Sequence, residues 1–415
     1  MSVTKTFNVT TVFWFALAIV AVPSAQAQTF QLLHSFAGGL DGANPFAGVT
    51  VDQHGNVYGT TGYGGTSNYG TVFKVAHAGS GWIFNPLYSF TNSDQQGTSA
   101  PLRIGPDDTL FGTTGYGGAA HLGSVYNVRP PANPCRGVIC YWTEIELYSF
   151  TGAPDGSEPG LGAIVFDQAG NLYGATVNGG ANNGGVVYKL AHSQQGWTES
   201  VLYSLSDLHT GMNPYGGVIF DNAGNLYGTT ITAGGNGNGA VYELTDLGAG
   251  WIGQFAYAFP VRDLDAGEQP YGGVIFDGSG NLYGDTAAGG VNGAGVIYQL
   301  TPAGGSWTET VLYNFTGNYQ GPKYGLAIDA AGNLYGTTFQ GGVHQVGNVF
   351  RLSPSNGQWV YTDLYDFTGG DDGAYPLDGV ALDANGNLYG TTEVGGTHGG
   401  ICSDVGCGTV WEITP

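Results

Sequence analysis

Residues 217–230 read Gly-Val-Ile-Phe-Asp-Asn-Ala-Gly-Asn-Leu-Tyr-Gly-Thr-Thr, and this stretch decides the fold. The apolar run 218–220 has the length and the β-branched character of one short strand. Asp221 and Gly224 stand at the first and fourth positions of a tight turn, where these residue types are favoured. Residues 225–230 then form a second strand. The stretch therefore predicts a β-hairpin.

The hairpin recurs seven times along the chain. Its second strand carries an aromatic residue at the same place in every copy, namely at Tyr58, Phe111, Tyr173, Tyr227, Tyr283, Tyr335 and Tyr389. The steps between these residues are 53, 62, 54, 56, 52 and 54, and the long step contains an insertion near residues 130–140. Self-similarity at a period of about 54 residues is typical of a repeat architecture.

Each copy continues with two more strands, represented by residues 240–244 and 251–259. The fourth strand begins with Trp251 and ends at Phe259, and five other copies have a tryptophan at the same spacing. Alternation places several of its aromatic residues on one face. A glycan-binding stripe is one interpretation, but packing against the neighbouring unit is favoured because six equivalent copies suit a core better than six ligand sites.

The two ends of the chain complement each other. Residues 408–413 read as a third strand with no fourth strand after it, and residues 29–36 read as a fourth strand with none of the first three before it. A closed ring removes long exposed sheet edges. We therefore predict an all-β fold, a seven-bladed β-propeller of four-stranded blades, in which the N-terminal strand closes the last blade. Residues 28–415 are expected to form this single domain.

The first 27 residues have the pattern of a secretory signal peptide. A basic Lys5 precedes an apolar run at 12–22, and Ala25 and Ala27 have the small side chains expected before a cleavage site. The run is too short to cross a bilayer as a helix. The sequence thus predicts export to the periplasm or the medium and no membrane association after cleavage.

Charge excludes one class of partner. The chain has 9 Lys and Arg against 31 Asp and Glu, a net charge of −22. Such a surface does not bind nucleic acid by neutralising phosphates. A carbohydrate, a protein or peptide, or a cation remains open as a ligand, and a monomer is expected.

The repeat resembles a known family. Asp-x-x-Gly-Asn-Leu-Tyr-Gly-Thr-Thr, the Gly-Gly loop after it, Gly-x-Val-Tyr-x-Leu and the Leu-Tyr-Ser-Phe ending are similar to those of the bacterial GloVer tandem-repeat proteins, the "choice-of-anchor" group. The resemblance extends over essentially all of residues 29–415. It implies an exported β-propeller-like protein. Because that family has no established activity, it supplies no catalytic residues.

Four cysteines form two local pairs, Cys135 with Cys140 and Cys402 with Cys407. In an exported protein, each pair is expected to form a disulfide that closes a loop. The two segments lie in different kinds of loop, on opposite faces of the predicted ring, so cross-pairing is excluded by distance.

Acidic residues and histidines gather in the loops of one rim. Oxygen ligands on such loops suit calcium, which is the one cofactor hypothesis that we retain. Asp-Gly pairs are also ordinary turn formers, and single histidines are more often plain loop residues than metal ligands. The candidate ligand-binding residues of this rim are Asp41, Asp155, Asp265, Asp371, Asp372, His344 and His398.

No catalytic motif stands out. The sequence has no Gly-x-Ser-x-Gly, no His-Glu-x-x-His and no phosphate-binding glycine loop before a helix. The sequence favours an exported binding or scaffolding propeller that recognises a carbohydrate, peptide or cation through its loop rim. The alternative is an extracellular enzyme, similar to a polysaccharide lyase or hydrolase, with acids or histidines on the same rim. A cluster that breaks the sevenfold pattern near the central channel would favour the enzyme.

Overall fold

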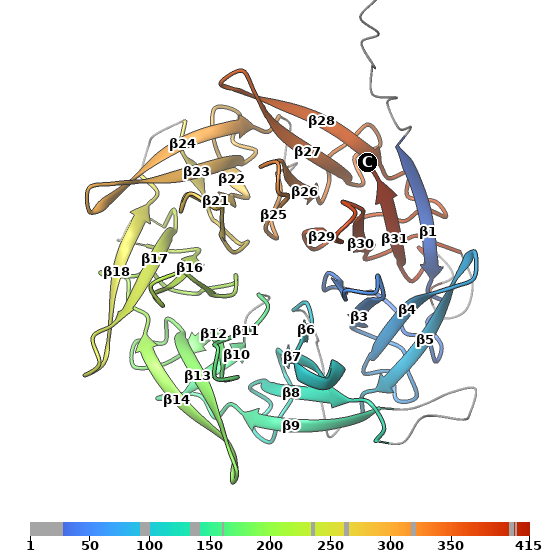
Figure 1. The fold of residues 1–415 in the computed structure, drawn as a ribbon, viewed down its shortest axis with the longest axis horizontal. Coiled ribbons are helices and arrows are strands. Elements are labelled where there is room, and N and C mark those ends of the chain that lie inside the picture. The colour runs from blue at the N-terminus through green and yellow to red at the C-terminus, as the bar shows by residue number, and fades with distance from the viewer. Residues whose placement is uncertain are drawn as a thin grey trace, which may run out of the picture.

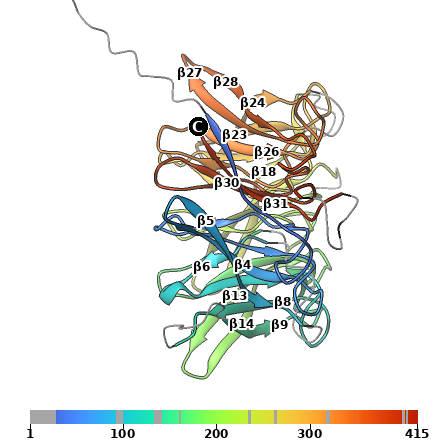
Figure 2. The ribbon, with the colours of Figure 1, turned by 90° about the vertical axis from the view of Figure 1, so that its right-hand side faces the viewer.

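The computed structural model describes residues 28–91, 100–132, 142–159, 162–233, 237–260, 265–316, 321–397, 402 and 405–415. Seven antiparallel sheets surround a central axis, with the first strand of each sheet innermost and the fourth outermost (Figure 1). Seen from the side, the ring is a thick disc with loops on both faces (Figure 2). This is the seven-bladed β-propeller of four-stranded blades that the repeat predicts.

The blades are numbered from the first complete repeat. Blade 1 contains β2 (Thr50–Val51), β3 (Val57–Thr61), β4 (Thr71–Ala78) and β5 (Gly81–Ser89). Blade 2 contains β6 (Arg103–Ile104), β7 (Leu110–Thr114), β8 (Ser124–Arg129) and β9 (Thr143–Ser149). Blade 3 contains β11 (Val165–Phe166), β12 (Leu172–Gly179), β13 (Val186–Ser193) and β14 (Gly196–Ser204). A short 3-10 turn, η1 (Pro106–Asp108), lies between β6 and β7.

The remaining four blades repeat this order. Blade 4 contains β15 (Ile219–Phe220), β16 (Leu226–Thr230), β17 (Ala240–Asp246) and β18 (Trp251–Ala258), and blade 5 contains β20 (Ile275–Phe276), β21 (Leu282–Asp285), β23 (Val296–Ala303) and β24 (Ser306–Asn314). Blade 6 contains β25 (Ala327–Ile328), β26 (Leu334–Thr338), β27 (Asn348–Ser355) and β28 (Gln358–Asp366). Blade 7 contains β29 (Ala381–Leu382), β30 (Leu388–Thr392), β31 (Thr409–Thr414) and β1 (Thr29–Ser35). Three further short strands, β10 (Gly156–Pro159), β19 (Gly267–Glu268) and β22 (Ala288–Gly289), pair loops on the rim.

The seventh blade is assembled from both ends of the chain, as predicted. Strand β1 pairs antiparallel with β31, from Thr29 opposite Thr414 to Ser35 opposite Thr409. The ring of Phe30 stacks on that of Tyr365 in blade 6, with 4.0 Å between the centroids. The N-terminal strand therefore completes a sheet and also contacts the preceding blade.

The aspartate of the repeat motif fixes the turn between the first two strands of a blade. In blade 5, Asp277 Oδ1 accepts the N–H groups of Ser279 and Asn281, while its Oδ2 accepts from Asn281 Nδ2 at 2.7 Å and from Tyr283 OH at 3.2 Å. Partial burial raises the pKa of Asp277, but these hydrogen bonds outweigh it and leave that pKa below its usual value. One carboxylate thus explains why Asp, Asn and Tyr occur together. In blade 2, where Gly105 replaces the aspartate, Phe111 replaces the tyrosine.

The glycine of the same motif makes room for an aromatic ring. A Cβ atom on Gly284 would lie 2.3 Å from the hydroxyl oxygen of Tyr298 on the next strand. Every blade has this contact, in which the glycine is Gly59, Gly112, Gly174, Gly228, Gly284, Gly336 or Gly390 and the ring is Phe, Tyr or Trp. The close approach of two strands, rather than an unusual backbone angle, requires glycine here.

Seven apolar clusters lie between adjacent blades, and a tryptophan at the start of a fourth strand packs against six of them. Trp307 of blade 5, for example, meets Tyr227 of blade 4 edge to face at 5.9 Å. The interpretation of the aromatic face as inter-blade packing is therefore confirmed. Within the described part of the chain, no helix is long and apolar enough to cross a membrane.

Candidate functional site

Three of the predicted rim acids stabilise the turns that contain them. Asp155 Oδ2 accepts from the N–H of Thr151 at 2.9 Å and from Tyr148 OH at 3.0 Å. Asp372 makes the same two contacts with Thr368 and Tyr365. Asp41 accepts from the Ala37 N–H at 2.8 Å and lies 3.2 Å from His34 Nε2. These contacts give all three acids a structural role, and their role in ligand binding remains a prediction.

The other predicted rim residues are not gathered into one cluster. Asp265, Asp371 and His344 are exposed. His398 lies outside the described residues. Within the described ranges, no group of three or more His, Cys, Asp or Glu side chains is close enough together to hold a metal ion. Calcium binding on this rim therefore remains a prediction.

Of the two predicted disulfides, one falls on described residues. Cys402 and Cys407 are joined by a disulfide that closes the loop between β30 and β31. The Cys407 carbonyl accepts the N–H of Asn44 at 2.8 Å, which ties this loop to the segment that leads into blade 1. Cys135 and Cys140 lie outside the described residues.

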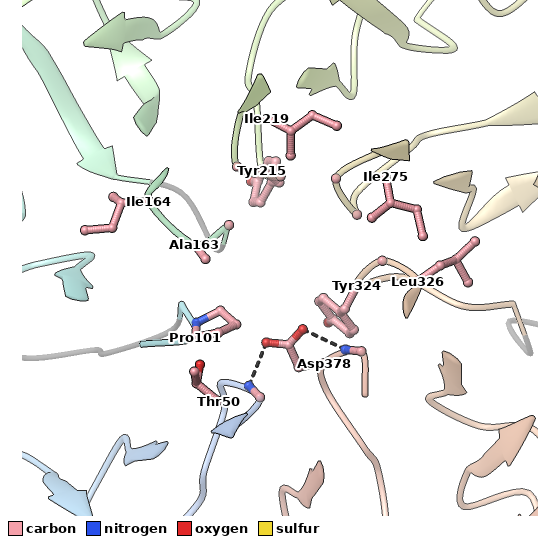
Figure 3. Close-up of a pocket in the computed structure, with 18 of the residues that line it drawn as sticks. Thr50, Pro101, Ala163, Ile164, Tyr215, Ile219, Ile275, Tyr324, Leu326 and Asp378 are labelled. Atoms are coloured by element: carbon pink, nitrogen blue, oxygen red, sulfur yellow. Dashed lines mark hydrogen bonds between the residues drawn. The ribbon is translucent and has the colours of Figure 1, made fainter. Parts of the chain in front are cut away.

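The central channel contains a cavity of about 590 Å³ (Figure 3). Its wall is built from the segments that lead into the first strand of each blade. Two residues before each of these strands stands a small residue or proline: Gly48, Pro101, Ala163, Gly217, Gly273, Gly325 and Gly379. Close packing of backbone on backbone limits the side chain at some of these positions, because a Cβ on Gly217 would lie 2.5 Å from the carbonyl oxygen of Ala163 in the preceding blade.

One position of this wall breaks the sevenfold pattern. Three residues before the first strand, five blades have a small side chain, at Ala47, Ala100, Gly162, Gly216 and Gly272. Blades 6 and 7 instead have Tyr324 and Asp378, which lie close together in the channel wall (Figure 3). The two adjacent blades thus introduce a phenol and a carboxyl group where the other blades have only hydrogen or methyl.

Asp378 links the last blade to the first. Its Oδ2 accepts the N–H of Gly48 in blade 1 and its Oδ1 accepts the N–H of Gly379, both at 2.6 Å (Figure 3). Burial raises the pKa of Asp378 to about 7, because it outweighs these two hydrogen bonds and is reinforced by the nearby Asp285 carboxyl. Each carboxylate oxygen can accept a second hydrogen bond, so Asp378 can still receive donors from a ligand in the channel.

Three tyrosines lie along the same arc of the wall. Tyr215 of blade 4 contacts Tyr271 of blade 5, with 5.3 Å between the ring centroids. Tyr324 follows in blade 6. Burial raises the pKa of Tyr324 to about 12, and the negative charges of Asp378 and Glu393 add to this rise. Tyr324 therefore remains a neutral hydrogen-bonding group, and all three tyrosines present apolar ring faces.

A second carboxyl group, Asp285, lies directly behind this wall. At the equivalent position of blades 4, 6 and 7, a threonine hydroxyl donates to a carbonyl oxygen of the next blade: Thr229 to Gly272 at 2.8 Å, Thr337 to Asp378 at 2.7 Å and Thr391 to Ala47 at 3.0 Å. Asp285 is 1% exposed and accepts the Gly325 N–H at 3.2 Å through Oδ2. Its Oδ1 is buried against Gly272 and has no hydrogen-bond partner among the described residues.

Replacing Asp285 with threonine is expected to stabilise the ring by about 2 kcal/mol at pH 8 and by much less at pH 4. Burial raises the pKa of Asp285 to about 7, above its ordinary value of 3.8. The folded state therefore loses stability relative to the unfolded state as the pH rises from 3.8 to about 7. Threonine does not ionise and can donate to the next blade.

Urea unfolding of both proteins at the two pH values measures this difference. Asp371→Thr is the matched control, because it removes an exposed acid from the same chain. A gain of equal size at pH 4 and pH 8, or a loss of stability at pH 8, would contradict the assignment of Asp285 as a strained buried acid.

Comparison with known proteins identifies the repeat. A sequence model of the Gloeobacter/Verrucomicrobia repeat matches residues 18–140, 142–308 and 249–415. The chain belongs to this family. The matches to the Gloeobacter/Verrucomicrobia repeat confirm the resemblance seen in the motifs, and they extend over nearly the whole chain. No curated protein has a sequence that matches it.

Solved structures show the same architecture at low identity. An ulvan lyase of a polysaccharide lyase family, bound to -[GlcA(1-4)Rha3S]-, is 11% identical with a TM-score of 0.52, and the alignment covers 91% of this Gloeobacter/Verrucomicrobia repeat chain and 95% of the lyase. A PQQ-bound aldose sugar dehydrogenase from Streptomyces coelicolor is 11% identical with a TM-score of 0.44, covering 93% and 98%. At such identity, the likeness to the lyase shows a shared fold and nothing about activity.

Sequence reasoning placed the candidate site on the loop rim and missed the channel residues of this Gloeobacter/Verrucomicrobia repeat protein. The signal was present in the alignment of the seven copies. Asp285, Tyr324 and Asp378 each replace the residue type that most other blades have at the same position. Repeat periodicity shows where copies agree, whereas a departure of one copy from the others marks a candidate site.

Proposed function

We propose that this protein is an exported carbohydrate-binding propeller whose ligand site is the central channel, at the arc formed by blades 4 to 7. The observation that supports it best is the break in sevenfold symmetry at Tyr324 and Asp378. Five blades pack with a small residue at this position, so the ring does not require a phenol or a partly buried acid there. Since perturbed carboxyl groups in a cavity are frequent at functional sites, this arc is the best candidate.

The chemistry of the arc suits a sugar. The cavity volume of about 590 Å³ lies within the range of small-molecule sites, which combine an apolar lining with a few placed polar groups. Tyr215, Tyr271 and Tyr324 supply flat apolar faces and hydroxyl groups. Asp378 supplies acceptors for hydroxyl donors. A pyranose ring has both an apolar face and a rim of hydroxyls, so it matches both kinds of group.

Binding to glycans tests this proposal. The mature chain is expected to bind a defined oligosaccharide on a glycan array, and calorimetry then gives its affinity. Tyr324→Gly and Asp378→Gly each introduce the residue that Gly216 and Gly272 provide in other blades. Each change is expected to weaken binding at least about tenfold, since a hydrogen bond or a ring contact is worth about 1.4 kcal/mol or more.

The rim variants Asp371→Asn and His344→Ala serve as controls and are expected to bind as the unchanged protein does. Loss of binding in the rim variants together with unchanged binding in the channel variants would move the site to the rim. If no glycan binds at all, the proposal fails.

One observation favours an enzyme as the second candidate. A carboxyl group whose pKa is near 7, beside the Tyr324 phenol, has the properties of a general acid or base at neutral pH. An extracellular polysaccharide lyase or hydrolase would use such a pair. Products released from any polymer by the mature chain, and their absence with Asp378→Asn, would establish this candidate in place of simple binding.

A further inference from the structure

We infer that the part of the channel at Tyr324 and Asp378 is a subsite for a positively charged group of the ligand, so that the ligand is an amino sugar rather than a neutral one. This inference rests on the proposed carbohydrate site and names the class of sugar. It is carried by the charges that surround the subsite, by the absence of an ion pair between these acids and a described cation of the protein, and by the aromatic faces beside them.

Anionic groups reach the subsite from several elements. Asp378 lines the cavity from blade 7, and Asp285 lies behind Gly272 and Gly325 with one carboxylate oxygen that no described group satisfies. Glu393, half-buried at the end of β30, adds a third acid whose charge acts on Tyr324. Because buried negative charges repel each other, this arc favours whatever positive charge can enter.

Among the described residues, no cation of the protein forms an ion pair with the acids of the subsite. Within the described ranges the structure has one ion pair, His34 with Asp41, which lies on the rim. The ammonium group of Lys323 lies over the ring of Phe339, 5.2 Å from its centroid. Arg103 lines the cavity from blade 2 and forms no ion pair with any described acid. The balancing charge is therefore left to the ligand.

The surroundings of the subsite suit an ammonium group. The faces of Tyr215, Tyr271 and Tyr324 attract cations through the negative potential above an aromatic ring. The net charge of −22 raises the local concentration of cationic ligands and speeds their approach. A neutral sugar would use the same tyrosines and the same acceptors but would not favour the ionised form of the Asp378 carboxyl.

A cation beside Asp378 favours the ionised carboxylate. At pH 6 the carboxyl is mostly protonated, because burial raises its pKa to about 7. Binding of an ammonium group lowers that pKa and releases the proton to the buffer. Proton release on binding is therefore a signature that a hydrogen bond from a neutral hydroxyl does not produce.

Calorimetry of the mature chain with three tetrasaccharides tests the inference. The probes are the β-1,4 tetramers of glucosamine, N-acetylglucosamine and glucose, measured at pH 6 in two buffers of different ionisation enthalpy. We expect the glucosamine tetramer to bind at least tenfold more tightly than either neutral tetramer and to release up to one proton. Asp378→Asn should abolish both the preference and the release, and Asp371→Asn should change neither.

The outcomes separate the two proposals. Equal binding of the charged and neutral tetramers, or binding of the charged tetramer without proton release, would overturn the cationic subsite while leaving the carbohydrate site intact. A preference that Asp378→Asn retains would also overturn it. Failure of every tetramer to bind would overturn both the subsite and the proposed function.

Discussion

A chain that begins at residue 37, and so lacks residues 28–36, is expected to lose the cooperative unfolding of the intact ring, with a fall in stability of more than about 5 kcal/mol. This deletion removes all of β1 and, with it, the partner of β31. It also removes Phe36, which is fully buried in the cluster between blades 7 and 1, and Phe30, which stacks on Tyr365. The loss exposes a sheet edge and opens the seam through which the ring closes.

Thermal unfolding followed by circular dichroism measures this effect. The chain that begins at residue 28 is the control. A peptide of residues 28–38 added to the shortened chain is expected to restore part of the melting temperature, because it can pair with β31 as β1 does. If the shortened chain, with no peptide added, melted at the same temperature as the control, β1 would not be the strand that closes the ring.

Gly284→Ala is expected to destabilise the protein by about 3 kcal/mol, the upper end of the usual range for an overpacked core. The new methyl group would lie 2.3 Å from the Tyr298 hydroxyl oxygen and 2.5 Å from its Cζ. Tyr298 is fully buried, so its ring cannot move aside without displacing the strand beneath it. The contact recurs in all seven blades, which explains why the motif has glycine between its aromatic residue and its threonines.

Gly278→Ala is the matched control, because this glycine lies in the turn before the same strand and a Cβ there meets nothing within 4 Å. Its stability is expected to stay within about 0.5 kcal/mol of the unchanged protein. Urea unfolding compares the two variants. Equal effects from both would show that the glycine of the motif is retained for some reason other than the aromatic ring above it.

The strands and turns of the repeat could be predicted from the sequence, because the interactions that form them join residues of the same strand or of two neighbouring strands. The Asp277 turn, for example, depends on residues at most six positions away, so its pattern appears directly in the chain. Closure was also readable, since the chain ends with three strands of a blade and begins with the fourth. Seven copies of one unit made these predictions mutually consistent.

The sequence did not show why the glycine of the motif is the same in all seven copies. Nothing near Gly284 in the sequence indicates that Tyr298 lies across it. This contact joins two strands separated by a loop, and it exists only once the register of β21 and β23 is set. Sequence therefore showed which residue recurs, whereas packing showed why no other residue fits.

The sequence by itself determined the number of blades, their four strands, the turn chemistry and the closure of the ring, because those features follow from periodicity and local hydrogen bonding. Only the tertiary structure decided where the candidate site lies. Asp285 and Asp378 are far apart in the chain and belong to different blades, yet the curvature of the ring brings their charges within reach of each other. The rim acids Asp41, Asp155 and Asp372 are held in turns, and their role in ligand binding stays a prediction. Asp285 and Asp378 acquire their raised pKa values from burial, which is a property of the folded ring alone.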